Sequence, residues 1–149
     1  MTAIYSYIKA VDEYTEYTLR GPDSIDAPGI TELATIDGAT YVAVHDGVEL
    51  PEQLPQIAAS VQPVVLTPEL RERIKAASPQ CRLIAQRVID KIRARYPADE
   101  EHYLTRIAVG QLSGLYTPSA AEIAEVQALG TFVEEVRQWG RQQRAELGL

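Results

Sequence analysis

Three residues have side chains that commonly act as nucleophiles, bases or metal ligands: Cys81, His45 and His102. A thiol beside an imidazole can form a nucleophilic pair, so Cys81 with either histidine is one candidate. Cys81 nevertheless lies on an apolar helical stripe with Ile84 and Val88, which favours a small buried side chain. One cysteine and two histidines are too few for a conventional zinc site. The sequence therefore predicts no catalytic, cofactor-binding or metal-binding residues and no enzymatic activity.

Carboxylates and glycines give no stronger sign of chemistry. Asp99, Glu100 and Glu101 are consecutive, so on a helix they point in different directions, and their place at a helix start suits the helix dipole. No glycine-rich phosphate-binding pattern occurs in the sequence. We expect these acids to stabilise a helix rather than to bind a cation.

The segment 71–95 is the one candidate for nucleic-acid binding, with eight basic and two acidic residues. Against this reading stand the sequence pI near 4.8 and the lack of aromatic residues between the basic ones. A solvated helical face is favoured. Residues 1–66 carry ten acids and two bases, so the two segments could dock within the chain or between copies, or simply form separate solvated faces.

Tyrosine accounts for eight of the ten aromatic residues, and five tyrosines fall in the first 41 positions. Tyrosines suit protein-binding surfaces, and they equally suit a half-exposed sheet. The candidate protein-contact residues comprise these tyrosines, three basic residues and the tryptophan: Tyr5, Tyr7, Tyr14, Tyr17, Tyr41, Arg82, Arg87, Lys91 and Trp139. The last helix also carries an apolar stripe over 126–136, which favours a core role over an oligomer seam.

The composition is that of a folded globular protein, with 46% hydrophobic and 23% charged residues among 149. We expect no signal peptide and no membrane association, because no apolar run approaches about 18 residues. The single cysteine excludes an internal disulfide.

The first part of the chain reads as β-structure. Runs at 4–11 and 14–19 are rich in tyrosine, threonine and β-branched residues. Turn residues follow at 21–23 and 27–29. Asp37-Gly38 between the runs 31–36 and 39–44 predicts a hairpin with a type I′ turn.

The second part reads as helices. Thr67-Pro68, Ser78-Pro79 and Thr117-Pro118 each precede a helical pattern, with a hydroxyl for capping and a proline suited to the first turn. Ser119 and Glu122 also fit a capping box. Apolar stripes cover 81–96, 104–112 and 123–136. The segment 50–66 contains three prolines and reads as a connector with a short helical turn.

The predicted fold is therefore α+β. A small acidic, tyrosine-rich antiparallel β unit at 1–49 is followed by the connector 50–66 and a unit of three to four helices at 67–149.

Three stretches, Ala34–Val44, Val65–Lys75 and Val136–Leu147, resemble small proteins encoded among the tail genes of bacteriophages and prophages. The C-terminal half is similar to tail-fibre assembly proteins, whose last helix often carries a tryptophan. The resemblance implies a non-enzymatic virion tail component or tail-fibre chaperone, located in the host cytoplasm or the virion. Its partner would be a tail or tail-fibre protein, or a further copy of the chain, and neither nucleic acid nor membrane.

Two other hypotheses remain. The acidic front half could block a basic groove of a host defence protein, as a phage-encoded inhibitor would. The least favoured hypothesis is a small enzyme that uses Cys81 or a histidine.

Overall fold

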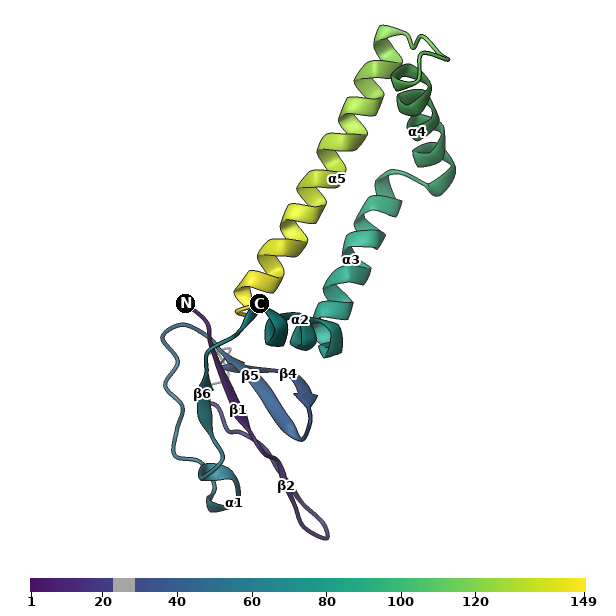
Figure 1. Ribbon diagram of the computed structural model, residues 1–149. Coiled ribbons are helices and arrows are strands. Elements are labelled where there is room, and N and C mark those ends of the chain that lie inside the picture. The colour runs from purple at the N-terminus through teal and green to yellow at the C-terminus, as the bar shows by residue number, and fades with distance from the viewer. Residues whose placement is uncertain (23–28) are drawn as a thin grey trace. The chain divides into compact units, whose positions relative to one another are not determined.

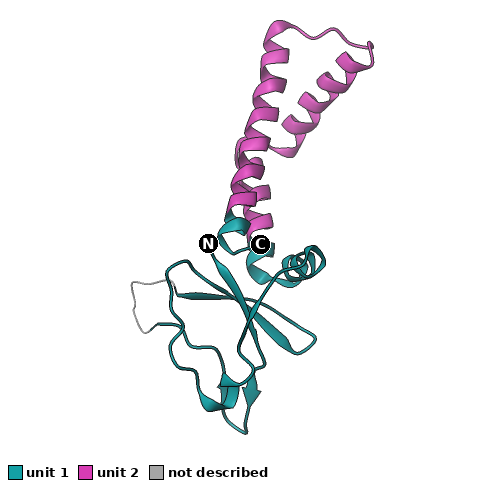
Figure 2. Ribbon diagram, turned by 60° about the vertical axis from the view of Figure 1, so that its left-hand side comes forward, with its two compact units in different colours: residues 1–83, 143–149 teal, residues 84–142 magenta. Residues whose placement is uncertain are grey.

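The computed structural model describes residues 1–22 and 29–149, and it has the predicted α+β class (Figure 1). An antiparallel sheet comes first and helices follow. The chain forms two compact units, a sheet unit of residues 1–83 and 143–149 and a helical unit of residues 84–142 (Figure 2). The predicted turn residues at 23 and 27–28 lie outside the described ranges.

The main sheet has four antiparallel strands in the order β4-β5-β1-β6. They are β1 (Ala3–Tyr7), β4 (Ile30–Ile36), β5 (Ala39–Val44) and β6 (Gln62–Val64). The predicted hairpin is confirmed as β4–β5, and Asp37 and Gly38 have the positive φ angles of 51° and 82° that a type I′ turn requires. A bulge between Glu32 and Ala34 shifts the register of this pair.

The predicted connector is more structured than its prolines indicate. It contains the four-residue helix α1 (Pro55–Ala58), in the expected position of a helical turn, and also the strand β6. β6 pairs with β1, with Pro63 opposite Tyr5. Proline is tolerated there because β6 lies at the edge of the sheet. The segment thus belongs to the sheet unit.

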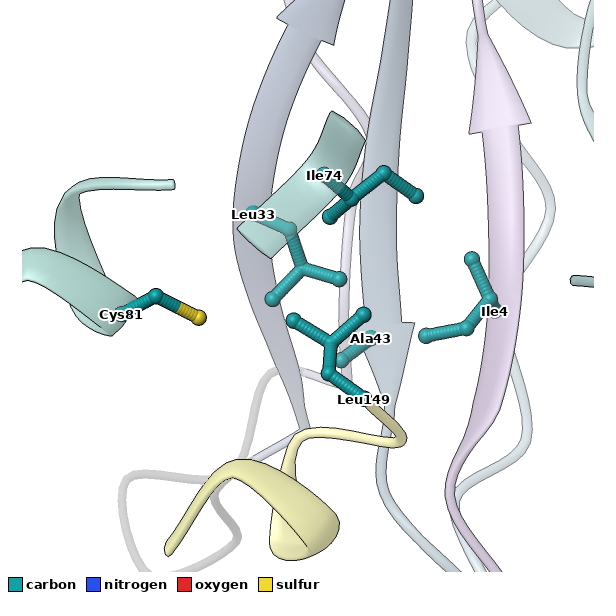
Figure 3. Packing of buried hydrophobic residues seen from close by; sticks show 6 residues of the cluster. All are labelled: Ile4, Leu33, Ala43, Ile74, Cys81 and Leu149. Atoms are coloured by element: carbon teal, nitrogen blue, oxygen red, sulfur yellow. The ribbon is translucent and has the colours of Figure 1, made fainter. Parts of the chain in front are cut away.

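Alternation along the strands divides the core of the sheet unit between the two faces of the sheet. On one face, Leu33 and Ala43 pack with Ile74 of α2 (Pro68–Ala77). Leu149 joins this cluster from the C-terminal segment, as Figure 3 shows. On the other face, a second cluster contains Tyr7, Leu19, Val42 and Ile57. The sheet is therefore covered on both sides.

The compact units differ from the predicted division at residue 67. Helix α2 contacts β4, and the C-terminal residues 143–149 belong to the sheet unit because Leu147 and Leu149 pack with its core. The sheet unit thus contains the first predicted helix, the start of α3 and the end of the last predicted helix.

Two of the three predicted hydroxyl caps are confirmed. The Thr67 hydroxyl accepts a hydrogen bond from the Leu70 N–H at 3.2 Å, at the start of α2. The Ser78 hydroxyl accepts from the Cys81 N–H at 3.4 Å, at the start of α3 (Pro79–Arg95). The Thr117 cap is wrong, because α5 (Ala120–Glu146) begins three residues later.

Ser119 caps α5 through the predicted capping box with Glu122. The Ser119 hydroxyl accepts from the Glu122 N–H at 3.2 Å, and the Glu122 carboxylate accepts from the Ser119 N–H at 2.7 Å. The two reciprocal bonds satisfy two backbone N–H groups at the start of the helix, whereas a threonine cap would satisfy one.

In the helical unit, a small core joins the predicted stripes of α3, α4 (Ala98–Leu112) and α5. Tyr96, Leu104, Ile107 and Leu129 are buried together. Leu112 was predicted on the same α4 stripe but is 89% exposed. Helix α4 ends there, at a C-cap followed by Gly114 with a φ of 72°. The unit therefore leaves part of its apolar stripe uncovered.

Candidate protein-contact surfaces

A short β-hairpin in the sheet unit presents apolar side chains to solvent. It pairs β2 (Ala10–Val11) with β3 (Glu16–Tyr17) in a two-stranded sheet of its own. Ile8 just before it is 61% exposed, Val11 is 72% exposed and Tyr14 at its turn is 91% exposed. Figure 1 shows this hairpin extending beyond the end of the four-stranded sheet.

Asp12 fixes the turn of the β2–β3 hairpin. Its Oδ1 accepts the backbone N–H groups of Tyr14 at 3.0 Å and Thr15 at 2.8 Å, and its Oδ2 accepts the Tyr17 hydroxyl at 2.7 Å. These bonds, the one from the Tyr14 N–H first, hold the pKa of Asp12 below its usual value. Tyr14 is thus displayed on an ordered turn.

The five predicted contact tyrosines do not form one exposed surface. Tyr7 is wrong as a contact residue, because it is fully buried in the sheet unit. Its place opposite Thr40 in the β1–β5 pair and on the face covered by α1 explains this burial. Tyr5, Tyr17 and Tyr41 are half-buried, and Tyr41 packs against the core. Tyr14 alone of the five is fully exposed.

The other predicted contact residues belong to two units. Arg82 is exposed in the sheet unit and donates to the Ala77 carbonyl at 3.3 Å. Arg87 is exposed in the helical unit. Lys91 lies over the Trp139 ring, 4.8 Å from its centroid. The Lys91–Trp139 contact is worth about 0.5–1 kcal/mol at an exposed site. Both side chains therefore already stabilise the helical unit.

Among the described residues, the opposite charges predicted to dock form one ion pair, which lies inside the sheet unit. Arg73 of the basic segment pairs with Asp37 of the acidic front at 2.7 Å. Other basic side chains pair locally, as Lys75 does with Glu72 at 3.0 Å. The remaining charge of residues 71–95 is exposed on α2 and α3.

The candidate nucleophile and the candidate bases occupy different environments, with Cys81 and His45 in the sheet unit and His102 in the helical unit. Cys81 is buried in the core of the sheet unit, beside a cavity of about 420 Å³ that it lines with Glu72, Lys75, Ala76 and Arg144. His45 Nε2 lies 3.2 Å from the Thr31 hydroxyl, and His102 is exposed on α4. Within residues 1–22 and 29–149, no cluster of three or more metal-ligand side chains occurs.

A second surface is a groove between α4 and α5 in the helical unit, lined on α5 by part of the 126–136 stripe. The sequence favoured a core role for this stripe, and Leu129 is indeed buried in the core. The volume of the groove is about 390 Å³. Apolar residues from both helices line it, together with the charged residues Glu101, Glu134 and Arg137. The signal in the sequence was the α4 stripe, which continues to Leu112 at the end of the helix. The last residues of such a stripe can lie beyond the core that buries the others.

Comparison with known proteins finds no matching family model, no matching curated protein and no matching solved structure. Among the described helices, none has the length and apolar character needed to cross a membrane. Function must therefore be inferred from the surfaces themselves.

Proposed function

We propose that this chain is a non-enzymatic, phage-derived structural or assembly protein that acts through protein–protein contacts. It would be a tail component or a tail-fibre chaperone, found in the host cytoplasm, in the virion tail, or in both. The resemblance to proteins encoded among phage tail genes supplies the partner class, a tail or tail-fibre protein. The exposed apolar side chains on the ordered β2–β3 hairpin are the observation that supports a contact role.

The hairpin suits a binding surface for two physical reasons. Val11 and Tyr14 expose apolar area in the same short element, where burial by a partner would be favourable. The Asp12 hydrogen bonds already order the turn, so less conformational entropy is lost on binding. Tyrosine combines a large apolar ring with a polar hydroxyl and is enriched at interfaces.

The test is co-purification with the tail and fibre proteins encoded beside the gene. The tagged wild-type chain is co-expressed with each, and the affinity of any captured partner is measured by titration. Replacing Val11 and Tyr14 by serine should weaken binding at least about tenfold, since hot-spot residues at interfaces contribute on this scale. The matched control is Val65→Ser, because Val65 is 92% exposed elsewhere in the sheet unit.

Failure would take either of two forms. If the wild-type chain captures none of these proteins and does not self-associate, the assembly role is rejected. If a tail protein binds the serine variant and the Val65→Ser control equally well, the role survives but the hairpin is not its contact surface.

The second candidate function is inhibition of a host defence protein through acidic residues. Its support is the excess of ten acids over two bases in residues 1–66, with exposed carboxylates on the hairpin at Glu13 and Glu16. Such an inhibitor would compete with DNA or RNA for a basic partner, and the competition would disappear at high salt. Binding to a tail protein that persists at high salt would favour the first candidate.

A further inference from the structure

The groove between α4 and α5 is an open apolar surface on the helical unit. Its apolar walls are Ala108, Val109 and Leu112 from α4 and Val126 and Val133 from α5, above Leu104 and Leu129, which are already buried in the core of the unit. The outer part is open to solvent, since Leu112 is 89% exposed and Val109 is 58% exposed. Two antiparallel helices with an apolar seam between them can pair with a second such hairpin to form a four-helix bundle.

Gly130 leaves the α5 backbone uncovered by a side chain on one side of the groove. It lines the groove, and a Cβ atom at its position would meet nothing within 4 Å. A neighbouring helix can therefore approach the α5 backbone closely at this point.

The charged residues of the groove gather at one end. Helices α4 and α5 run in opposite directions and are joined by the loop after Leu112 (Figure 1). Glu101 near the start of α4 and Arg137 in the second half of α5 thus lie at the end remote from this loop, and both line the groove. Glu134 lines the groove at the same end. Glu101 pairs with Arg93 and Glu134 pairs with Arg141, whereas Arg137 has no ion-pair partner among the described residues.

We propose that a second copy of this chain occupies the groove, so that two α4–α5 hairpins form a four-helix bundle around a two-fold axis parallel to the groove. In this arrangement α4 of each copy faces α5 of the other. The apolar ends of the two grooves meet, and Glu101 of each copy faces Arg137 of the partner subunit. An antiparallel arrangement would instead set the charged end of one groove against the apolar end of the other.

The charge of the helical unit suits self-association. Residues 84–142 contain seven bases and eight acids, so two such units do not repel each other strongly. The Glu101–Arg137 contact occurs twice in the dimer, which makes the surface complementary to itself. This inference does not depend on the proposed function, because the β2–β3 hairpin belongs to the other unit.

Charge reversal gives a specific test with the full chain. Arg137→Glu alone sets Glu101 against a glutamate twice, and Glu101→Arg alone sets Arg137 against an arginine twice. An equimolar mixture of the two variants restores opposite charges at both contacts of a heterodimer. Sedimentation equilibrium of the wild type, each variant and the mixture measures the dimer dissociation constant.

We expect the wild type to dimerise at micromolar concentration and each single variant to dissociate at least about tenfold more readily. The mixture should return to within a few-fold of the wild type. The matched control is Arg106→Glu, an identical charge change on the exposed part of α4 outside the groove. It should leave the dissociation constant unchanged.

Three results would overturn the proposal: a wild-type chain that stays monomeric at about 1 mM, a mixture no tighter than the separate variants, or an unchanged dimer in Leu112→Asp. Leu112 is almost fully exposed, so this last variant should keep its helical circular dichroism even if a charge-reversal variant unfolds. A folded, dimeric Leu112→Asp chain would show that the groove is not the interface.

Discussion

The Tyr7 hydroxyl is a buried polar group inside the sheet unit, where the side chain is 1% exposed. It is the one buried side-chain polar atom without a hydrogen-bond partner among the residues that the structure describes. The backbone of Leu19 lies near it but outside hydrogen-bond geometry. Burial is accordingly the main cause that raises the pKa of Tyr7.

Tyr7→Phe should therefore leave the free energy of unfolding unchanged or raise it by up to about 1 kcal/mol, because the ring is kept and an unsatisfied hydroxyl is removed. Tyr7→Ala should lower it by about 3–5 kcal/mol through loss of the buried ring. Urea unfolding followed by circular dichroism measures both, with Tyr14→Phe as the exposed control. A clear loss of stability in Tyr7→Phe would show that the hydroxyl has a partner.

At the scale of elements, Glu122 holds the start of α5 through its carboxylate. The Ser119 N–H is the largest cause of its lowered pKa, followed by the Tyr116 hydroxyl, which donates to its Oε1 at 2.9 Å. A lowered pKa means that the folded state favours the charged carboxylate. The stabilisation is therefore complete above the ordinary pKa of 4.5 and is lost as the pH falls through the lower value of the folded state.

We expect the wild-type chain to lose stability below pH 4.5 more steeply than Glu122→Gln, in thermal unfolding followed by circular dichroism at a series of pH values. Ser119→Ala should cost about 0.5–2 kcal/mol at neutral pH through loss of the cap. Glu125→Gln, an exposed change three residues along the same helix, is the control. Equal pH profiles for the wild type and Glu122→Gln would contradict the assignment.

Two glycines within helices should respond in opposite ways to alanine. A Cβ at Gly110 would lie 2.8 Å from the Tyr116 Cβ, and the Gly110 carbonyl accepts the Tyr116 N–H at 3.1 Å. Gly110→Ala should thus destabilise the α4–α5 turn despite the better helix propensity of alanine. Gly130→Ala meets no atom and should stabilise the chain by about 0.5–1 kcal/mol.

Thermal unfolding at low protein concentration, where association does not contribute, measures both glycine variants. Each is the control for the other, because the substitution is the same. A stabilised Gly110→Ala chain would mean that the turn adjusts to the added methyl group.

The elements that depend on residues close together in the sequence could be predicted from it. The β4–β5 turn depends on two adjacent residues, Asp37 and Gly38, and the capping box depends on residues three apart. Strand β6 was missed because its pairing is with β1, which is about sixty residues earlier, and because Pro63 argues locally against a strand. A tertiary partner overrode the local preference there.

At the scale of the whole molecule, the division into units was the part that the sequence could not supply. Leu147 and Leu149 look like the end of an amphipathic helix, yet they join the sheet core with Leu33 and Ala43. Of the candidate surfaces, Tyr14 was predicted. Ile8 and Val11 were not, because their exposure depends on how the short β2–β3 pair stands beside the main sheet.

Leu149→Ala should destabilise the sheet unit by about 2–5 kcal/mol, the range for loss of a large buried aliphatic side chain. Hydrogen exchange read by mass spectrometry should show faster exchange in β1 and β5, which carry Ile4 and Ala43 of the same cluster. Leu115→Ala, at a residue 88% exposed, is the control. Unchanged exchange in both strands would mean that the C-terminal residues do not stabilise the sheet.

The contribution of residues 143–149 to the sheet core has a consequence for the order of folding during synthesis. The strands leave the ribosome early, but Leu147 and Leu149 follow only after the whole helical unit has been made. The helices of residues 84–142 depend on nearby contacts and can form first. Until Leu147 and Leu149 have emerged, the nascent sheet thus lacks part of its hydrophobic core, which makes this the period when a chaperone or an early partner matters most.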